Sequence, residues 1–456
     1  MIAPLAGLDV RTRPPQLALW GGVECSVVRI GDRVRDQVVE TGHHLRGDDL
    51  LRIAQLGIKT VRYPVIWEKV SPARPEHCNW AWHDNQMRRM RDLSLRPIVG
   101  LVHHGSGPDH SQFLAGRFSE GLAVHARNVA ERYPWVNCYT PVNEPLTTAR
   151  FSMLYGLWHP HLCDHDAFLR TVVEQCIATI LSMSAIKTVN KDALLVQTED
   201  IGRIFSTPRL RYQANYENER RWLSLDLLCG RVERDHPFYR TLVQAGVSER
   251  ELAFIRDSGP VVDVIGMNHY LTSDRYLDER LSLFPRTSHG GNGRDCYADI
   301  EAFRADLPDA ELGPGARLSE LWARYGLPIA VTEVHNGAAP DEQARWLMEV
   351  WQAATELRSC GADVRAVTVW SMFGAVDWNS LLTAENGHYE TGVFDIGGKS
   401  LRPTLLAEAT TALATSGSWH HASLANVGWW RQSERVLATL RDQSRRCASG
   451  SSEKQE

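Results

Sequence analysis

The 456-residue sequence lacks the patterns of a secreted or membrane-spanning protein. Its nine cysteines are an odd set without a C-x-x-C pair, so they do not suggest a disulfide framework. No window approaches about eighteen uninterrupted apolar residues, and residues 1–15 lack the charged and apolar regions of a signal peptide. We therefore expect a cytoplasmic protein with no membrane partner.

An excess of charge of one sign is also missing. The chain carries 50 Lys and Arg against 55 Asp and Glu, a formal net charge of −5, and no basic run is interleaved with aromatic residues. We therefore expect no nucleic-acid partner. A glycine-rich dinucleotide fingerprint is absent as well, so no nucleotide cofactor is expected, and in fact no cofactor of any kind.

Tryptophan, in contrast, is abundant. The fifteen Trp residues outnumber both the twelve Tyr and the eleven Phe, and many lie near Asn, Asp, Glu or His. Flat apolar faces beside polar groups suit sugar rings, although large cores also use tryptophan. The composition therefore agrees with a small carbohydrate as partner, without establishing it.

One pattern recurs along most of the chain: a short β-rich run, a polar residue at its C-terminal end, then a helical stretch. Eight such units predict an α/β fold with a single (β/α)8 TIM barrel over residues 16–416. Residues 1–15 are predicted to be a leader, 417–456 a helical or polar tail with a disordered end, and 284–315 a long surface loop. The eight runs are residues 17–23, 57–63, 97–102, 136–142, 193–198, 261–267, 328–332 and 364–370.

The C-terminal ends of these runs carry the residues that chemistry would need. In such barrels these ends face one pocket, and catalytic groups come from several strands. Among the glutamates at these ends are Glu144 and Glu333, each preceded by an apolar run, and a pair of carboxyl groups is what cleavage of a glycosidic bond requires. The strand-end residues are Glu24, Arg62, His103, Asn143, Glu144, Glu199, Asn268, Tyr270, Glu333 and Trp370.

Several short motifs at these positions resemble those of family 1 glycoside hydrolases, from about Leu19 to Ala407. Arg62 to Trp67 reads R-Y-P-V-I-W, similar to the family's R-F-S-x-x-W. Residues 143–145 read N-E-P, residues 266–270 read G-M-N-H-Y, and Thr332-Glu333 begins a nucleophile motif. Trp370-Ser371 followed by Asp377-Trp378 matches the spacing of W-S-L-x-D-N-F-E-W.

The resemblance implies a role for each matched residue. Glu144 would be the general acid/base and Glu333 the nucleophile. Supporting residues would be Arg62 and Tyr270, which would flank the nucleophile, and Asn268 of the G-M-N-H-Y motif. Contacts to the sugar would come from His103, Asn143, Trp370, Asp377 and Trp378.

Elementary electrostatics agrees with this assignment. Arg62 close to Glu333 would hold the pKa of that carboxyl low and keep it ionised. Glu144 has to be protonated to act as an acid, and an ester formed at Glu333 would remove a negative neighbour. The pKa of Glu144 would then fall, so the same residue would serve as the base in the second half of the reaction.

Each assignment has a structural alternative. The two glutamates could be salt-bridge partners, Trp370 and Trp378 could be core residues, and Arg62 could be an ion-pair partner inside the barrel. His103-His104 could suggest a metal, but no third ligand follows at a zinc-like spacing, so no metal is expected. Glu199-Asp200 could contact the sugar or anchor a loop, and the sequence does not decide between these.

The departures from the family pattern fall on the sugar-binding side. The family glutamine after the first strand is replaced by Val28, and Glu24 is the candidate to take over its role. The nucleophile motif reads T-E-V-H-N-G, Asp377 replaces a glutamate, and His104 follows His103 where the family has tryptophan. The reaction type is therefore better supported than the identity of the sugar.

Together these observations predict a retaining exo-β-glycosidase for small β-glycosides, similar to β-glucosidases or β-galactosidases. Two alternatives stay open: a barrel that binds a sugar or sugar nucleotide without hydrolysing it, and a transglycosidase that uses the same site. The sequence also leaves open whether the chain forms a homo-oligomer.

Overall fold

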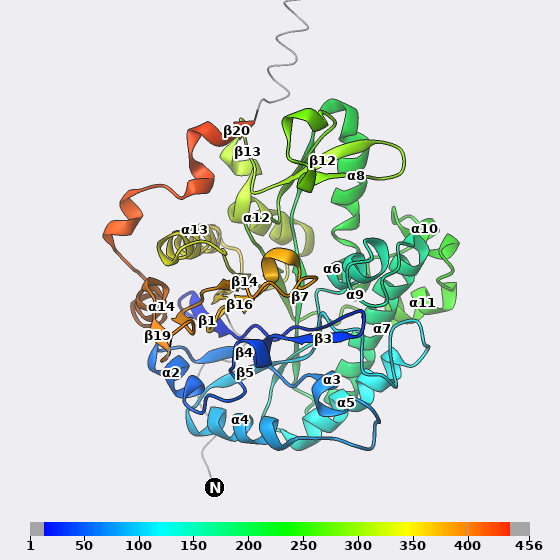
Figure 1. Ribbon diagram of the computed structural model, residues 1–456. Coiled ribbons are helices and arrows are strands. Elements are labelled where there is room, and N and C mark those ends of the chain that lie inside the picture. Colours follow the sequence, from blue (N-terminus) through cyan, green and yellow to red (C-terminus); the bar gives the residue numbers. More distant parts are fainter. Residues whose placement is uncertain (1–12, 399, 438–456) are drawn as a thin grey trace, which may run out of the picture.

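The computed structural model describes residues 13–398 and 400–437, and within them eight parallel strands close into a barrel (Figure 1). Strand β1 pairs with both β4 and β15, and this closes the ring. The predicted (β/α)8 fold is confirmed, with a strand in each of the eight predicted runs. In spatial order they are β1 (Ala18–Gly22), β15 (Val364–Val369), β14 (Ile329–Val334), β9 (Val264–Asn268), β7 (Leu194–Asp200), β6 (Cys138–Asn143), β5 (Arg96–His103) and β4 (Thr60–Pro64).

The strands are apolar because the barrel buries them on both faces. Every residue of β4, β6, β9, β14 and β15 is buried. One layer of the interior contains the large ring of Trp20 beside the small side chains of Ala330 and Ala366, together with valine and isoleucine side chains from other strands. Large and small residues on different strands thus fill the barrel as a packed core.

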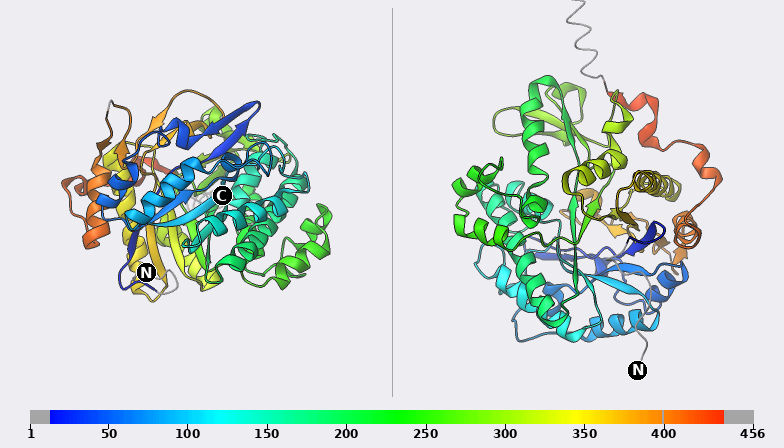
Figure 2. Two further views of the ribbon diagram at one scale, coloured as in Figure 1. Left: turned by 90° about the horizontal axis from the view of Figure 1, so that it is seen from below. Right: turned by 180° about the vertical axis from the view of Figure 1, so that it is seen from behind.

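Helices form an outer layer around the strands, as the views from below and from behind show (Figure 2). Most have an amphipathic pattern, and their apolar faces pack onto the barrel. The longer ones are α2 (Asp49–Gln55), α4 (Ala81–Asp92), α5 (Phe118–Arg132), α7 (His165–Val189), α8 (Arg211–Arg220), α11 (Glu249–Asp257), α12 (Gly313–Tyr325), α13 (Pro340–Ser359) and α14 (Leu405–Ser416). The shorter ones are α1 (Gln37–Glu40), α3 (Trp67–Val70), α6 (Pro145–Ala149), α9 (Leu223–Leu228) and α10 (Tyr239–Gln244).

Helix α7 is long and apolar enough, by length and composition alone, to cross a membrane. In this fold it is one of the barrel's outer helices. It packs against α5, α9 and β6, and 56% of its most apolar window is buried inside the protein. Its apolar character is therefore explained by packing in the helical layer.

The segment 284–315, predicted to be a surface loop, contains regular structure, so that prediction was wrong in part. A four-stranded sheet forms above the barrel (Figure 1) from β8 (Ile204–Ser206), β10 (Arg275–Asp278), β12 (Cys296–Glu301) and β11 (His289–Gly291). The strands within residues 284–315 could not be recognised from the sequence, because this segment is rich in Gly and Asp and its apolar and polar residues alternate only weakly. Helix α12 then begins at Gly313.

Small two-stranded elements complete the loops around the barrel mouth. A hairpin of β2 (Val27–Ile30) and β3 (Arg33–Asp36) follows the first barrel strand. After the last barrel strand come β16 (Ala375–Val376) with β17 (Tyr389–Glu390), and β18 (Phe394–Asp395) with β19 (Arg402–Pro403). These elements hold the segment that carries Asp377 and Trp378.

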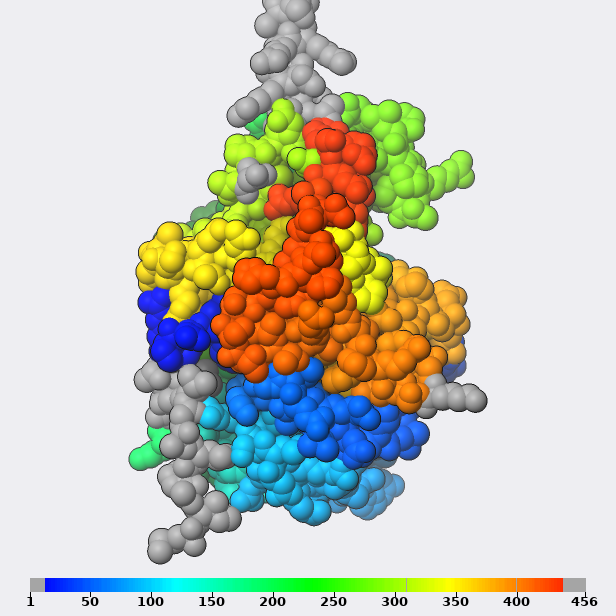
Figure 3. All heavy atoms as spheres, turned by 90° about the vertical axis from the view of Figure 1, so that its left-hand side faces the viewer, coloured from blue at the N-terminus to red at the C-terminus, as the bar shows by residue number. Residues whose placement is uncertain are grey.

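The structure describes the C-terminal segment after α14 as far as Leu437. Gly417, with φ of 74°, ends the helix in the left-handed conformation. The following residues 418–437, called the C-terminal strap below, form short 3₁₀ turns and end in β20 (Val436–Leu437), which pairs with β13 (Arg304–Ala305). Figure 3 shows the strap in orange to red along one face of the molecule. The predicted leader (except residues 13–15) and the predicted disordered end of the tail lie outside the described residues.

Candidate active site

A cavity of about 840 Å³ opens at the C-terminal ends of the barrel strands. Its volume is in the range of small-molecule sites. Of the residues predicted from the sequence, six line it directly and five lie buried beneath them. The first group is Glu24, Glu144, Tyr270, Glu333, Trp370 and Trp378, and the second is Arg62, His103, Asn143, Asn268 and Asp377.

Glu333 lies near the end of β14, where a shift in register interrupts the pairing with β9 and β15. Arg62, on β4, donates from Nη1 to Glu333 Oε1 at 2.6 Å and to the carbonyl of Thr332 at 2.8 Å. The hydroxyl of Tyr270 donates to the other carboxyl oxygen. Both oxygens of Glu333 are therefore held by donors from two other strand ends.

The pKa of Glu333 reflects opposing effects. Burial raises it above the ordinary value, while Arg62 and the hydrogen bond from Tyr270 lower it. The sequence led us to expect that Arg62 would keep the pKa of Glu333 low, but the loss of hydration outweighs the ion pair. Burial also raises the pKa of the Tyr270 phenol far above 10, so this group keeps its proton and remains a donor.

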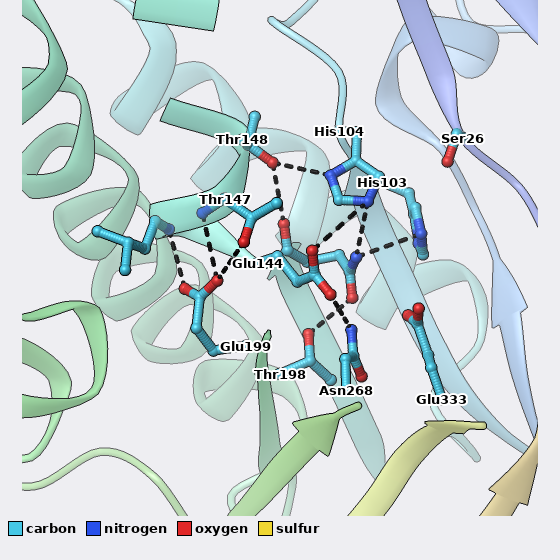
Figure 4. A network of polar contacts seen from close by, with 12 residues as sticks. Ser26, His103, His104, Glu144, Thr147, Thr148, Thr198, Glu199, Asn268 and Glu333 are labelled. Carbon is cyan, nitrogen blue, oxygen red and sulfur yellow. Dashed lines mark hydrogen bonds and ion pairs between the residues drawn. The ribbon is translucent and has the colours of Figure 1, made fainter. Parts of the chain in front are cut away.

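Glu144 follows β6 and begins the short helix α6. Its φ of 46° and ψ of 66° place it in the left-handed region, and Pro145 occupies the first helical position. A non-glycine residue in this region is strained, and such strain tends to persist at functional sites. Asn268 on β9 donates its amide to Glu144 Oε1, and His104 Nε2 lies 3.8 Å from Oε2 (Figure 4).

The pKa of Glu144 is raised well above its ordinary value. Burial is the main cause, followed by the negative charges of Glu333, Asp200 and Glu199, while the hydrogen bond from Asn268 acts in the opposite direction. Glu333 has an arginine beside it and Glu144 has none. Of the two carboxyl groups Glu144 therefore has the more strongly raised pKa, and Glu333 ionises first.

Asn143 joins the two halves of the site. Its Oδ1 accepts from Arg62 Nη2 and from the hydroxyl of Thr198, both at 2.7 Å. Its Nδ2 lies 3.2 Å from His103 Nε2 and 3.4 Å from His104 Nε2 (Figure 4). Two donors on Oδ1 settle the orientation of the amide, so Nδ2 is the group that it presents to the histidines.

Burial keeps both histidines neutral. It lowers the pKa of His103 well below 6.5, with further contributions from His104 and Arg62, and it lowers the pKa of His104 to about 3. The His103 ring stacks on Trp370, with centroids 5.6 Å apart and planes 10° apart. Neutral histidines can both accept and donate hydrogen bonds, which suits contacts to hydroxyl groups.

Trp370 and Glu24 lie side by side in the cavity wall. The indole Nε1 donates to Glu24 Oε2 at 3.0 Å, and Ser26 donates to Oε1 from its backbone N and its hydroxyl at 2.9 and 2.6 Å. The guanidinium of Arg62 lies 4.8 Å from the centre of a Trp370 ring. Gly22 is needed beneath this ring, because a Cβ there would be 2.2 Å from Cε3.

Asp377 does not reach the cavity. Its Oδ2 accepts from Arg35 Nη2 at 3.0 Å and its Oδ1 accepts from the backbone N of His388 at 2.8 Å. The neighbouring Trp378 does line the cavity, and its buried Nε1 has no partner among the described residues. Val28 lies in an apolar cluster with Trp158 and contributes no hydrogen bond from its side chain.

Glu199 is a loop anchor, which answers the question that the sequence left open. Its carboxylate accepts from the backbone N of Leu146 and Thr147 at 2.8 and 3.2 Å, and from the hydroxyl of Ser224 at 2.7 Å. It therefore holds the start of α6 directly behind Glu144. Asp200, the next residue, lines the cavity, and its buried Oδ1 has no partner among the described residues.

Sequence reasoning missed many polar residues of the cavity wall, among them His335, Asn336 and Glu390. His335 lies between Trp370 and Glu390, 3.1 Å from the Trp370 carbonyl and 2.8 Å from Glu390 Oε2. Asn336, which is 7% exposed, leaves its Nδ2 without a partner among the described residues. The unusual T-E-V-H-N-G sequence was the available signal for His335 and Asn336, whereas nothing local marked Glu390.

A metal site is not apparent in the described part of the chain. Within residues 13–398 and 400–437, no group of three or more His, Cys, Asp and Glu side chains is arranged to hold a metal ion. His103 and His104 are instead engaged with Asn143, as described above.

Comparison with known proteins gives the same fold. No family model matches the chain. Beta-glucosidase 47 of Arabidopsis thaliana is 22% identical over 453 residues, covering 88% of this chain and 80% of the relative, and thermostable beta-glucosidase B of Thermobispora bispora is 25% identical, covering 79% and 77%. The family 1 β-glucosidase of Thermotoga maritima has a TM-score of 0.70 at 14% identity, covering 89% of this chain and 99% of that one. The chain has the fold of the family 1 β-glucosidases.

The resemblance to family 1 that the motifs indicated is thereby confirmed at the level of the fold. The sequence relatives and the structural neighbour are named β-glucosidases, and this chain shares their fold. The same T. maritima enzyme has been solved in complex with deoxynojirimycin, again with a TM-score of 0.70.

Proposed function

We propose that this family 1-like barrel is a retaining exo-β-glycosidase that hydrolyses small β-glycosides by double displacement. One observation carries the proposal: two buried carboxyl groups share a cavity and have opposite surroundings. Glu333 is held by Arg62 and Tyr270, whereas the oxygens of Glu144 lie near the amide of Asn268 and the neutral His104. A nucleophile and a proton donor need these two different environments.

In the first half-reaction the carboxylate of Glu333 attacks the anomeric carbon of the sugar. The bond from that carbon to the leaving-group oxygen breaks, and Glu144 gives its proton to this oxygen. The products are the free alcohol and a glycosyl ester on Glu333. Because the negative charge of Glu333 has then disappeared, the pKa of Glu144 falls and its carboxylate becomes a base.

In the second half-reaction water replaces the alcohol. Glu144 takes a proton from the water molecule as its oxygen attacks the anomeric carbon, and the ester bond to Glu333 breaks. The carboxylate that leaves is received again by Arg62 and Tyr270. The sugar is released with the anomeric configuration of the substrate, because the carbon has been inverted twice.

The printed names of the relatives concern β-glucosides, and β-glucosides are accordingly the first substrates to try. We expect the wild-type protein to hydrolyse a 4-nitrophenyl β-glycoside and to release the β-anomer first, as followed by proton NMR. Glu333→Gln should abolish turnover. Full activity in Glu333→Gln, or an initial α-anomer, would overturn the proposal.

Glu144 is tested separately with two leaving groups. Glu144→Gln should lower kcat/KM about 10²- to 10⁴-fold for a phenyl glycoside, whose leaving group needs the proton. The loss should be much smaller for a 2,4-dinitrophenyl glycoside, whose leaving group does not. An equal loss for both substrates would contradict the acid role of Glu144.

A second candidate function rests on the altered sugar side of the site. Asp377 is engaged by Arg35, and Val28 is apolar, so two family contacts to the sugar are missing. This arrangement favours a barrel that binds a sugar or sugar nucleotide without turnover. Saturable binding measured by calorimetry, with no release of aglycone across a panel of α- and β-glycosides, would select that candidate. Transfer of the sugar to an added alcohol in preference to water would indicate a transglycosidase.

A further inference from the structure

The C-terminal strap, residues 418–437, is anchored to the barrel by a buried tryptophan. Trp430 is 6% exposed, donates from Nε1 to Glu349 Oε2 at 2.8 Å, and packs edge-on against Trp346 with ring centroids 5.5 Å apart. The adjacent Arg431 donates to the other oxygen of Glu349 at 2.6 Å. The middle of the strap is therefore fixed to helix α13 by packing and by an ion pair.

The end of the strap is attached to the other side of the cavity. Strand β20 pairs in parallel with β13, with Val436 opposite Arg304. Arg435 donates to the carbonyl of Ala302, and Ala302 itself lines the cavity. The strap thus runs from α13 to the segment that follows β12, as Figures 1 and 3 show.

Directly before the first of these attachments, the strap brings Trp429 to the cavity. Its side chain is half-buried and forms part of the cavity lining. Its backbone N lies 3.4 Å from the carboxylate of Glu342, at the start of α13. The guanidinium of Arg435 lies 4.4 Å from the centre of its ring, so one side of the indole is supported by a cation.

The position of Trp429 differs from that of the catalytic residues. Glu144 and Glu333 come from the strand ends, whereas Trp429 comes from a segment that runs outside the barrel helices. Arg435 links it to Ala302 on one side, and Glu342 links it to the start of α13 on the other. The same cavity is lined by the apolar side chains of Phe151, Leu157 and Leu271. Charged side chains, among them Arg220, Arg275, Asp299 and Glu301, line the cavity as well, so it suits a flat group that combines an apolar face with polar edges.

We propose that Trp429 is the platform on which the leaving group of the substrate stacks, so that the C-terminal strap determines the leaving-group specificity of this site. The ligand chemistry is a flat face with C–H or π character, supplied by an aromatic ring or by a second sugar. The inference rests on the proposed function, because it assigns the part of the substrate that departs. It makes Trp429 a specificity residue that takes no part in proton transfer.

The test compares three β-glycosides that share one sugar and differ in the leaving group: 4-nitrophenyl, methyl and a second glucose. Trp429→Ala should raise KM for the 4-nitrophenyl glycoside about tenfold, the factor that corresponds to one lost aromatic contact. KM for the methyl glycoside should change less than about twofold, because methyl cannot reach a stacking partner. Trp429→Phe should retain most of the wild-type affinity. An equal change for aryl and methyl glycosides, or no change for either, would overturn the proposal.

The disaccharide separates the two sources of a flat face. A parallel rise in its KM assigns the platform to sugar rings as well, and an unchanged value restricts the platform to aromatic groups. Arg435→Met, which removes the cation behind the indole, should cause a smaller rise in the same aryl-specific direction. Val427→Ala is the matched control, because Val427 belongs to the strap, is 65% exposed and does not line the cavity. Melting temperatures of all variants show whether the strap is still packed.

Calorimetry keeps this inference separate from the proposed function. If the wild-type protein hydrolyses no glycoside, the proposed function fails, but binding of phenyl and methyl β-glucoside can still be compared. A preference for the phenyl compound that is lost in Trp429→Ala would support the platform on its own. Equal Kd values for the phenyl compound in wild type and variant would overturn it, whatever the outcome of the activity assay.

Discussion

Asn268 and Glu144 form a directed hydrogen bond between the ends of β9 and β6, which flank β7 in the barrel. The amide of Asn268 donates to Glu144 Oε1, while its Oδ1 accepts from the hydroxyl of Thr332 at 2.7 Å. Thr332 thereby determines which end of the amide faces Glu144. The bond favours the ionised form of the carboxyl group, so it holds the pKa of Glu144 below the value that burial and Glu333 alone would produce.

Replacing Asn268 by alanine removes this donor. We expect the pKa of Glu144 to rise further, so the alkaline limb of the kcat/KM profile should move to higher pH. The acid would also lose its orientation, and kcat/KM at the optimum should fall about 10- to 100-fold, as for a lost hydrogen bond to a charged group. Initial rates over a pH series with one aryl glycoside measure both effects.

Thr332→Val provides the control for orientation. It keeps Asn268 in place but frees the amide to turn, so a smaller loss and a smaller shift in the same direction are expected. An alkaline limb that moves to lower pH in Asn268→Ala would contradict the hydrogen-bond assignment.

Replacing Asp200 should move the alkaline limb of the kcat/KM profile in the opposite direction, to lower pH. Its negative charge raises the pKa of Glu144. Activity requires protonated Glu144 and is lost as pH rises through that pKa. Asp200→Asn removes the charge with little change in shape, so the pKa of Glu144 should fall and activity should decline at lower pH than in the wild type. The pH profile of kcat/KM is again the measurement.

Asp32→Asn is the matched control for charge, because Asp32 is exposed on the turn between β2 and β3 and does not line the cavity. Its profile should coincide with that of the wild type. Identical profiles for Asp200→Asn and wild type would show that Asp200 does not act on the acid.

Glu68 should make stability depend on pH. Burial raises the pKa of this carboxyl from 4.5 to about 7, although the backbone N of Gly107 donates to it at 3.0 Å. A carboxyl with a raised folded-state pKa stabilises the fold most below pH 4.5, and this contribution is lost as pH rises through 7. Glu68→Gln removes the dependence and keeps an acceptor for Gly107. The stability of the variant relative to wild type should increase by about 2 to 3 kcal/mol from pH 5 to pH 8.

Urea denaturation at the two pH values measures this difference. Glu76→Gln, which changes an exposed carboxyl nearby in the sequence, should differ from wild type by less than about 0.5 kcal/mol at both pH values. A relative stability of Glu68→Gln that stays constant from pH 5 to pH 8 would refute the assigned titration.

The barrel and the strand-end residues could be predicted because they depend on local patterns. Each of the eight runs is apolar over its whole length, as a strand buried on both faces must be, and it ends in a polar residue at the barrel mouth. Glu144 and Glu333 therefore stood out even though they are 189 positions apart in the chain. The contacts around each of these two carboxyl groups could be seen only in the folded structure. The same holds for the finding that burial outweighs Arg62 in setting the pKa of Glu333.

The parts that could not be predicted depend on contacts between distant segments. Nothing in the sequence near Asp377 indicates that its carboxylate would form an ion pair with Arg35. Likewise, nothing in the polar tail indicates that Trp429 would line the cavity. The sheet above the barrel combines β8 with β10 and β12, although about seventy residues separate the first two strands. Contacts of this kind leave no periodicity in either segment, so the sequence alone suggested a loop and a tail.

Arg35 is expected to be essential for the stability of the loop that carries Trp378. It is 4% exposed, pairs with Glu40 at 2.6 Å and with Asp377 at 3.0 Å, and donates to the carbonyl of Ala384 at 2.9 Å. Arg35→Met would leave the buried carboxylate of Asp377 without its cation. Removing one partner of a buried ion pair costs about 3 to 5 kcal/mol, and the free energy of unfolding should fall by this amount.

Arg33, on the same strand β3, is the matched control for Arg35. It pairs with Glu385 at 2.8 Å, but its side chain is 54% exposed and that of Glu385 is 52% exposed, so Arg33→Met should cost less than about 1 kcal/mol. Adding Asp377→Asn to Arg35→Met should recover part of the loss, because the double variant no longer buries an unpaired charge at that position. Equal costs for Arg33→Met and Arg35→Met in urea denaturation would show that the buried pair does not hold the loop. A loss for Arg35→Met that Asp377→Asn does not relieve would instead assign the effect to Glu40.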